Sequence, residues 1–259
     1  MSERASLVEA TIPEPREATL YLGSHHATTR WWALGVPLFV SVRVLKKRRG
    51  LPVAVAPWAL DSGGFTELDK FGRWETTEDE YVSEVERLQG IGLLAWVAPQ
   101  DWMCEPWMIQ KTGLSVAEHQ ERTVTSFMSL RDRLGPLVIP VLQGYAPREY
   151  DRCVEMYRDA GVDLSAEPIV GLGSVCRRSR TDEAIRLVHY LADHDLNLHG
   201  FGLKGDTFRA LRYVLVSADS MAWSFRGRHE PGCGPSHKSE ANCPRFAMQW
   251  RNQLIKEAA

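Results

Sequence analysis

Residues 59–68 read ALDSGGFTEL, which places an acid, a hydroxyl and two glycines directly behind an apolar run. Asp and Ser side chains bond their own backbone and paired glycines permit positive φ, so one interpretation is a turn after a buried strand. Another is a ligand site formed by Asp61, Ser62 and Gly63, with Phe65 as a stacking face. The choice between them depends on the rest of the chain.

Short apolar runs alternate with longer amphipathic segments along almost the whole chain. Runs typical of strands lie at residues 18–23, 37–42, 52–58, 93–99, 137–144, 168–173, 198–203 and 213–219. Apolar residues at three- and four-residue spacing predict helices at 77–92, 115–135, 147–162 and 181–196. This alternation, without a low-complexity linker, predicts one α/β domain over residues 1–259. We expect a (β/α)8 TIM-type barrel, with a doubly wound sheet as the alternative.

The two ends of the chain depart from this pattern. Residues 1–16 form a polar tail, and only a short connection separates the first two predicted strands, so we expect an irregular N-terminal quarter or an extra hairpin. Residues 229–243 gather Cys and His and predict a small metal-binding loop. We find no secretory signal and no apolar run long enough to span a bilayer. With five scattered cysteines, these features predict a cytoplasmic protein.

Polar or small residues follow five of the predicted strands. They are Asp61, Asp101, Gln143, Gly171 and Asp219. In a (β/α)8 barrel the carboxyl ends of the strands meet on one face, where active sites are built. One acid after a strand means little, because Asp commonly caps helices and opens loops. Five such positions on one face favour the ligand-site interpretation.

The overall charge does not indicate a nucleic-acid partner, because 31 Lys and Arg residues are balanced by 33 Asp and Glu residues. Local clusters of basic residues are more informative, since they attract phosphates even on a near-neutral protein. These clusters contain Lys46, Lys47, Arg48 and Arg49, then Arg177, Arg178 and Arg180, and finally Arg226 and Arg228. A solvated loop is the alternative interpretation for each cluster.

The motifs DSGGF, APQD, VLQG, VGLGS, FGLKG and SADS occur in this order between residues 61 and 220. In order and spacing they resemble the tRNA-guanine transglycosylases and their shorter relatives, the DNA-deazapurine transglycosylases of phages and bacteria. The runs LYLGSHHATTRWW and SADSMAWSFRGR are more similar to the DNA-acting group. The resemblance covers most of the chain from about residue 55 onward. It implies a (β/α)8 barrel that exchanges guanine in a nucleic acid for a 7-deazaguanine.

By this resemblance, two acids carry the chemistry. Asp219 matches the nucleophile, a carboxylate that attacks the anomeric carbon of the sugar and holds it as a covalent intermediate. Asp61 matches a second acid, which moves a proton at the base or only positions the nucleotide. A helix cap is the alternative role for Asp219.

The resemblance also implies which residues bind the purine. Asp101 would accept hydrogen bonds from the amino and ring N–H groups, and Gln143 would contact the carbonyl. Gly171 would add a backbone amide at the same edge. Phe65 and Phe201 would flank the ring plane, although aromatic residues beside strands also serve as core.

The loop at 229–243 places Cys233, His237 and Cys243 close together in sequence, and thiolates with an imidazole suit tetrahedral zinc. The related tRNA enzymes carry a structural zinc near this place, but their motif has three close cysteines and a later histidine. The fourth ligand is open between His229 and Glu240, and a loop with incidental Cys and His is the alternative. The expected zinc is structural, because the implied chemistry needs no Lewis acid.

The sequence therefore predicts an enzyme that installs a 7-deazaguanine, such as the cyano-substituted preQ0, in DNA. The basic runs at 46–49 and 177–180 would hold the strand while one guanine enters the barrel. Two alternatives remain open: the same exchange on tRNA, and a non-catalytic nucleic-acid-binding barrel. The presence of both Asp61 and Asp219 argues against the second.

Overall fold

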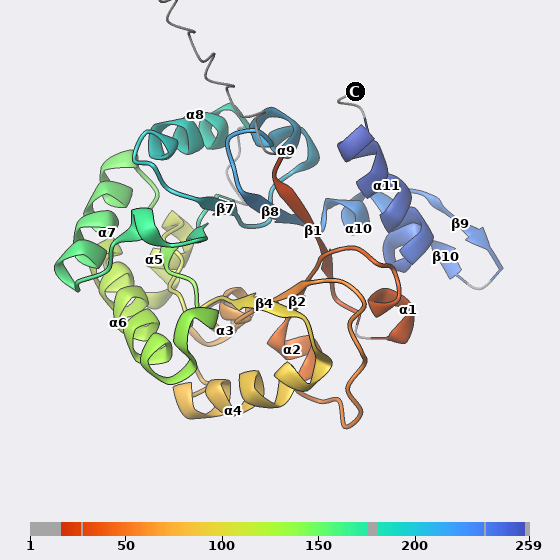
Figure 1. Cartoon of the computed structure of the whole chain (residues 1–259). Helices are drawn as coiled ribbons and strands as arrows, with labels where there is room; N and C mark the ends of the chain where they lie inside the picture. Colours follow the sequence, from red (N-terminus) through yellow and green to blue (C-terminus); the bar gives the residue numbers. More distant parts are fainter. Residues whose placement is uncertain (1–16, 27, 176–180, 236, 257–259) are drawn as a thin grey trace, which may run out of the picture.

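The computed structural model describes residues 17–26, 28–175, 181–235 and 237–256, so the predicted tail at 1–16 lies outside it. Eight parallel strands form one curled sheet in the order β4-β3-β2-β1-β8-β7-β6-β5, with helices around it (Figure 1). The edges of the sheet meet where Val97 and Val138 form a parallel bridge and the Ile139 N–H donates to the Val97 carbonyl at 3.1 Å. The predicted (β/α)8 barrel is confirmed.

The barrel strands are short and are followed by a separate hairpin. The barrel is built from β1 (Thr19–Ser24), β2 (Leu38–Ser41), β3 (Trp58–Asp61), β4 (Leu94–Val97), β5 (Val141–Leu142), β6 (Val170–Leu172), β7 (Leu198–Gly200) and β8 (Ser217–Ser220). The hairpin pairs β9 (Pro231–Gly234) antiparallel with β10 (His237–Ser239). In Figure 1 the hairpin lies outside the barrel, on the side of the C-terminal helix.

Helices of very different length connect the strands. They are α1 (Thr29–Trp32), α2 (Val42–Leu45), α3 (Gly64–Phe71), α4 (Glu78–Leu88), α5 (Pro106–Thr112), α6 (Val116–Leu134), α7 (Pro147–Asp159), α8 (Thr181–Ala192), α9 (Gly205–Leu211), α10 (Ala222–Gly227) and α11 (Pro244–Lys256). Short 3-10 turns are η1 (Gln89–Ile91), η2 (Gly135–Leu137), η3 (Leu164–Ala166) and η4 (Glu240–Asn242). None of the helices described is long and apolar enough to cross a membrane.

Local sequence signals explain where the long helices begin. The Thr77 hydroxyl accepts the Glu80 N–H at 3.2 Å, and three acids occupy the first turn of α4, where they complement the helix dipole. Ser115 and Glu118 form a reciprocal capping box at the start of α6. These helices match the predicted segments 77–92 and 115–135, with the first ending slightly earlier.

Alternate side chains of each strand face the helices or the barrel interior. Leu20 and Leu22 belong to the main core between strands and helices, whereas Tyr21 packs with Ala59 and Trp96 in a separate interior cluster. Inside the barrel, the Trp96 ring also lies edge-on to His199, with 4.7 Å between their centroids. Aromatic side chains therefore fill the barrel below its mouth.

One prediction about the N-terminal quarter was wrong, and the structure excludes one of the two alternatives left open there. The strand predicted at 52–58 is a loop in which Val53 and Val55 are 74% and 59% exposed, and β3 begins only at Trp58. Pro52 and Pro57 lack N–H donors, which disfavours sheet pairing of this run despite its apolar character. No extra hairpin joins the first two strands in the described part of the chain, since β1 and β2 are parallel and connected through α1.

Candidate active site

A cavity of about 780 Å³ opens at the carboxyl ends of the barrel strands. Six residues predicted from the sequence line it: Asp61, Phe65, Asp101, Gln143, Phe201 and Asp219. Sequence reasoning did not identify the other polar or charged lining residues, which are Ser24, His25, Ser41, Glu105, Ser174 and Lys204. The structure thus brings the predicted acids and aromatics together in one place.

The order of the strands places Asp219 opposite Asp101, and Phe65 opposite Phe201, across this cavity. Asp219 lies on β8 and Asp101 follows β4, and these strands are four positions apart in the ring of eight. Phe65 follows β3 and Phe201 follows β7, which are also four positions apart. A flat ligand between the two phenylalanines would therefore have one edge toward Asp101 and the other toward Asp219.

Asp219 is buried and held by backbone amides. Its Oδ1 accepts the Gly202 N–H at 2.8 Å, and its carbonyl accepts the Leu203 N–H at 2.9 Å. The fully buried His199 places Nε2 3.5 Å from the same Oδ1, while its Nδ1 lies 2.8 Å from the Ser217 hydroxyl. The Gly202 and His199 contacts both involve Oδ1 and not Oδ2. His199 was missed from the sequence, although a histidine between apolar strand residues was the available signal.

Asp61 is the last residue of β3 and opens onto the cavity. Burial among protein groups raises the pKa of its carboxyl, because desolvation disfavours the charged form. The nearby Ser41 hydroxyl and Gly63 amide lower this pKa by smaller amounts, whereas the negative charge of Asp219 raises it. Asp61 can therefore hold a proton at a higher pH than an exposed aspartate.

Asp101 and Gln143 form a hydrogen-bonded pair on the wall opposite Asp219. Gln143 Nε2 donates to Asp101 Oδ2 at 2.5 Å, and the Ser62 hydroxyl lies 3.5 Å from Asp101 Oδ1. Burial, followed by the charge of Asp61, raises the pKa of Asp101 to about 7. The pair offers acceptors on Asp101 and a second amide hydrogen on Gln143 to a planar polar ligand.

The amide of Gln143 is fixed at both ends. Its Oε1 lies 2.8 Å from the Ser174 hydroxyl, which lies 3.0 Å from Glu105 Oε2 and accepts the Cys104 N–H at 2.8 Å. A Cβ at Gly173 would lie 2.3 Å from Gln143 Nε2, so only glycine leaves room for this amide. Ser174 lies inside the motif VGLGS, yet sequence reasoning chose Gly171 as its binding residue.

Gly171 has a different role from the predicted one. It lies within β6 and does not line the cavity, and its N–H donates to the Pro140 carbonyl at 2.8 Å. This amide is already used by the sheet and cannot contact a base in this arrangement. A Cβ at Gly171 would lie 2.6 Å from Phe201 Cε2, so the glycine makes space for that ring inside the barrel.

The glycines of DSGGF shape the turn between β3 and α3. Gly63 has φ of 80°, and a Cβ there would lie 2.8 Å from Arg43 Cγ. A Cβ at Gly64 would lie 2.8 Å from Trp74 Cζ2. Both readings of the motif therefore hold in part, because the glycines build a tight turn and the turn places Asp61 and Phe65 at the cavity.

Comparison with known proteins adds a family to this geometry. The sequence profile described as "DpdA: DeoxyPurine in DNA protein A" matches residues 16–259. The chain belongs to the DpdA family. Membership confirms the expected DNA-deazapurine modification family and supports an enzyme of DNA modification. No curated protein matches the chain at a significant level.

The solved structures that are similar to this DpdA-family chain include two of low sequence identity. One is the HMG-CoA lyase from Brucella melitensis, with 12% identity, a TM-score of 0.47, and coverage of 92% of this chain and 91% of that chain. Another is 2,3-dimethylmalate lyase, a PEP mutase/isocitrate lyase superfamily member, with 12% identity, a TM-score of 0.41, and coverage of 94% and 92%.

The basic run at residues 46–49 of this DpdA-family chain does not form the cavity wall. Lys46 pairs with Glu80 at 3.6 Å, both side chains being exposed. Arg87, in the last turn of α4, donates to the carbonyl of Arg48 at 3.2 Å. None of Lys46, Lys47, Arg48 and Arg49 lines the cavity. The predicted binding residues Arg177 and Arg178 lie outside the described residues.

The C-terminal hairpin gathers four side chains that could hold a metal ion. The ligand atoms of Cys233, His237, Glu240 and Cys243 all lie within 4.8 Å of one another. The Cys233 and Cys243 sulfurs are 3.7 Å apart, and the buried Glu240 Oε2 has no hydrogen-bond partner among the described residues. Glu240 therefore joins the predicted ligands, whereas His229 packs on another side against the Phe225 ring.

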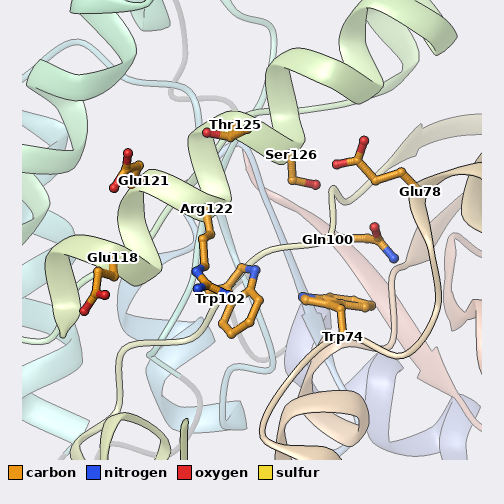
Figure 2. A pocket seen from close by; sticks show the side chains of 9 residues that line it. All are labelled: Trp74, Glu78, Gln100, Trp102, Glu118, Glu121, Arg122, Thr125 and Ser126. Carbon is orange, nitrogen blue, oxygen red and sulfur yellow. The ribbon is translucent and has the colours of Figure 1, made fainter. Parts of the chain in front are cut away.

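A second pocket, of about 480 Å³, lies beside the wall of the cavity (Figure 2). In Figure 2 the rings of Trp74 and Trp102 lie near each other, and the Arg122 guanidinium is 4.6 Å from the Trp102 ring centroid. Trp74 also packs against Gly64, which lines the cavity. None of the predicted site residues lines this pocket.

Proposed function

We propose that the chain is a DNA-guanine transglycosylase, which replaces guanine in DNA with a 7-deazaguanine such as preQ0. The observation that carries the proposal is the placement of a polar base-recognition pair, Asp101 and Gln143, across one cavity from Asp219. The acid Asp61 lines the same cavity. Membership in a DNA-deazapurine family supports DNA as the polymer.

The recognition pair suits the edge that guanine and 7-deazaguanine share. Asp101 accepts hydrogen bonds from the ring N–H and amino groups, and the second amide hydrogen of Gln143 donates to the carbonyl. The Ser174 contact keeps this amide in one orientation. Adenine lacks both the ring N–H and the carbonyl, so it would leave these buried polar atoms unpaired.

Base release begins with attack by Asp219. The Gly202 and His199 contacts involve Oδ1. The other oxygen, Oδ2, forms a bond to the anomeric carbon while the bond from that carbon to guanine N9 breaks. The electron pair of the broken bond goes to guanine, and Asp61 supplies the proton that makes guanine a neutral leaving group. The sugar is then held as an ester on Asp219.

The second half reverses these steps with the new base. The incoming 7-deazaguanine gives its ring proton to the Asp61 carboxylate, and its nitrogen attacks the anomeric carbon. The bond to Asp219 breaks, the carboxylate is regenerated, and two inversions restore the original stereochemistry. Atoms balance as a base exchange, so no oxidant, reductant or hydrolysis is required.

The hairpin cluster fits a structural zinc ion. Cys233, His237, Cys243 and Glu240 would hold it, because two thiolates, an imidazole and a carboxylate form a tetrahedral donor set. The metal would supply a fixed link between the hairpin and the start of α11, outside the catalytic cavity. Thiolate ligands also fit the reducing cytoplasm of a bacterial or phage-infected cell.

Isotope exchange tests the proposal directly. Purified protein is incubated with labelled guanine and either a DNA duplex or tRNA of matched concentration and salt. We expect label to enter DNA with the wild-type chain and not with Asp219→Asn. Label in tRNA alone would refute the DNA assignment, and label in neither polymer would refute the transglycosylase function.

A further inference from the structure

A solvent-exposed phenylalanine stands at the rim of the cavity. Phe225 is 65% exposed, and among the eight exposed large hydrophobic side chains of the described residues it alone lines the cavity. It lies on α10, which begins two residues after β8 and therefore close to Asp219. Single exposed apolar side chains are common on protein surfaces, so the place of this ring at the cavity mouth, and not its exposure, is the informative feature.

Neighbouring residues fix the backbone that carries this ring. Trp223 is fully buried and donates its indole N–H to the Gly23 carbonyl at 2.9 Å. The Ser224 hydroxyl donates to the Ala241 carbonyl at 2.8 Å. These contacts hold α10 against β1 on one side and η4 on the other. Phe225 is therefore presented to solvent from an anchored turn.

Two arginines follow Phe225 closely in the chain. Arg226 and Arg228 are exposed, and the Arg228 guanidinium is 5.8 Å from the Phe225 ring centroid. Arg226 makes a long 3.9 Å ion pair with Glu230 across exposed surface, which solvent screens strongly. An aromatic platform with adjacent arginines is the pattern by which proteins hold bases and phosphates of one strand.

We propose that Phe225 stacks on the base next to the extruded guanine, while Arg226 and Arg228 contact the flanking phosphates of the same DNA strand. The inference rests on the proposed function, because it takes the cavity as the destination of that guanine. Extruding a nucleotide unstacks its neighbours, and an apolar side chain that enters the gap replaces the lost stacking. The position of Phe225 at the cavity mouth places its ring where that gap would form.

Photocrosslinking and binding together test this contact. A DNA duplex carries 5-iodouracil next to a target guanine, and mass spectrometry locates the adduct after irradiation. The variants are Phe225→Ala, Phe225→Trp and the control Phe71→Ala. Phe71 is a matched control because it is 49% exposed, has the Lys70 ammonium 5.8 Å from its ring centroid, and does not line the cavity.

We expect the adduct on Phe225 in the wild-type chain and its loss in Phe225→Ala. Affinity for the duplex should fall between about 5-fold and 150-fold in Phe225→Ala, since one base–aromatic stack is lost. Phe225→Trp should retain affinity, and Phe71→Ala should behave as wild type. An adduct elsewhere, or equal affinity of Phe225→Ala and Phe71→Ala, would overturn the inference.

Failure of the proposed function gives a different result. An adduct on Phe225 without exchange of labelled guanine would support the strand contact and refute the transglycosylase. A matched RNA strand that crosslinks to Phe225 when DNA does not would overturn the choice of partner.

Discussion

Replacing Asp101 with Asn should change how stability depends on pH. Burial and the charge of Asp61 raise the pKa of Asp101 from its ordinary 3.8 to about 7. Between these two pKa values, Asp101 keeps its proton in the folded chain and has lost it in the unfolded chain. A raised pKa contributes stability at low pH, and that contribution disappears as the pH rises from about 4 to about 7.

The size of the effect follows from these two pKa values. Relative to a permanently neutral side chain, ionisable Asp101 lowers the free energy of unfolding by roughly 2 kcal/mol at pH 5 and roughly 4 kcal/mol at pH 8. Asp101→Asn is therefore expected to gain on the order of 2–3 kcal/mol over the wild type between these pH values. Asn also keeps an oxygen that accepts the Gln143 amide, so the comparison isolates the charge.

Urea unfolding followed by tryptophan fluorescence at pH 5, 6, 7 and 8 measures this difference. Asp132→Asn, an exposed position on α6, is the control for a change of net charge. As the pH increases, the free energy of unfolding of Asp101→Asn should rise relative to that of the wild type and of Asp132→Asn. A difference that stays constant from pH 5 to pH 8 would refute the reasoning about Asp101.

Three further changes and one control test the active site and the hairpin. His199→Phe removes the buried imidazole whose Nε2 lies 3.5 Å from Asp219 Oδ1 and should lower kcat by up to about a hundredfold, because that ring helps to position the carboxylate, with little change of KM in steady-state exchange assays. Gly173→Ala should displace the Gln143 amide and raise KM for the free base at least about tenfold. Gly50→Ala, with nothing within 4 Å of its Cβ, should match the wild type in the same assay. Cys233→Ser should lower zinc content by plasma mass spectrometry and lower the Tm, and unchanged metal content with an unchanged Tm would contradict the zinc assignment.

The sequence predicted the barrel because its signals are local and repeated. Alternating apolar runs, helix caps such as Thr77, and acids after strands all act within a few residues of one another. The loop at 51–57 was misread because valines between prolines have the composition of a strand, whereas the missing N–H donors decide against pairing. Composition alone does not reveal which partner a backbone amide finds.

The candidate site was predictable where motifs end strands, as at Asp61 and Asp219. Residues that act through packing were not predictable in this way. Gly171 makes room for Phe201, while Gly173 makes room for Gln143. Only the positions of these neighbouring side chains in the folded structure distinguish the two glycines. Glu240 was one of two sequence candidates for the fourth ligand, and only the 3-10 turn after β10 distinguishes it from His229 by placing it in the cluster.

Exchange of guanine in DNA through Asp219 can be measured by liquid chromatography with mass spectrometry of nucleosides from DNA incubated with the protein and preQ0. We expect one deazapurine deoxynucleoside gained for each free guanine released, and neither product with Asp219→Asn. Guanine released without incorporation, or equal incorporation by Asp219→Asn, would contradict it.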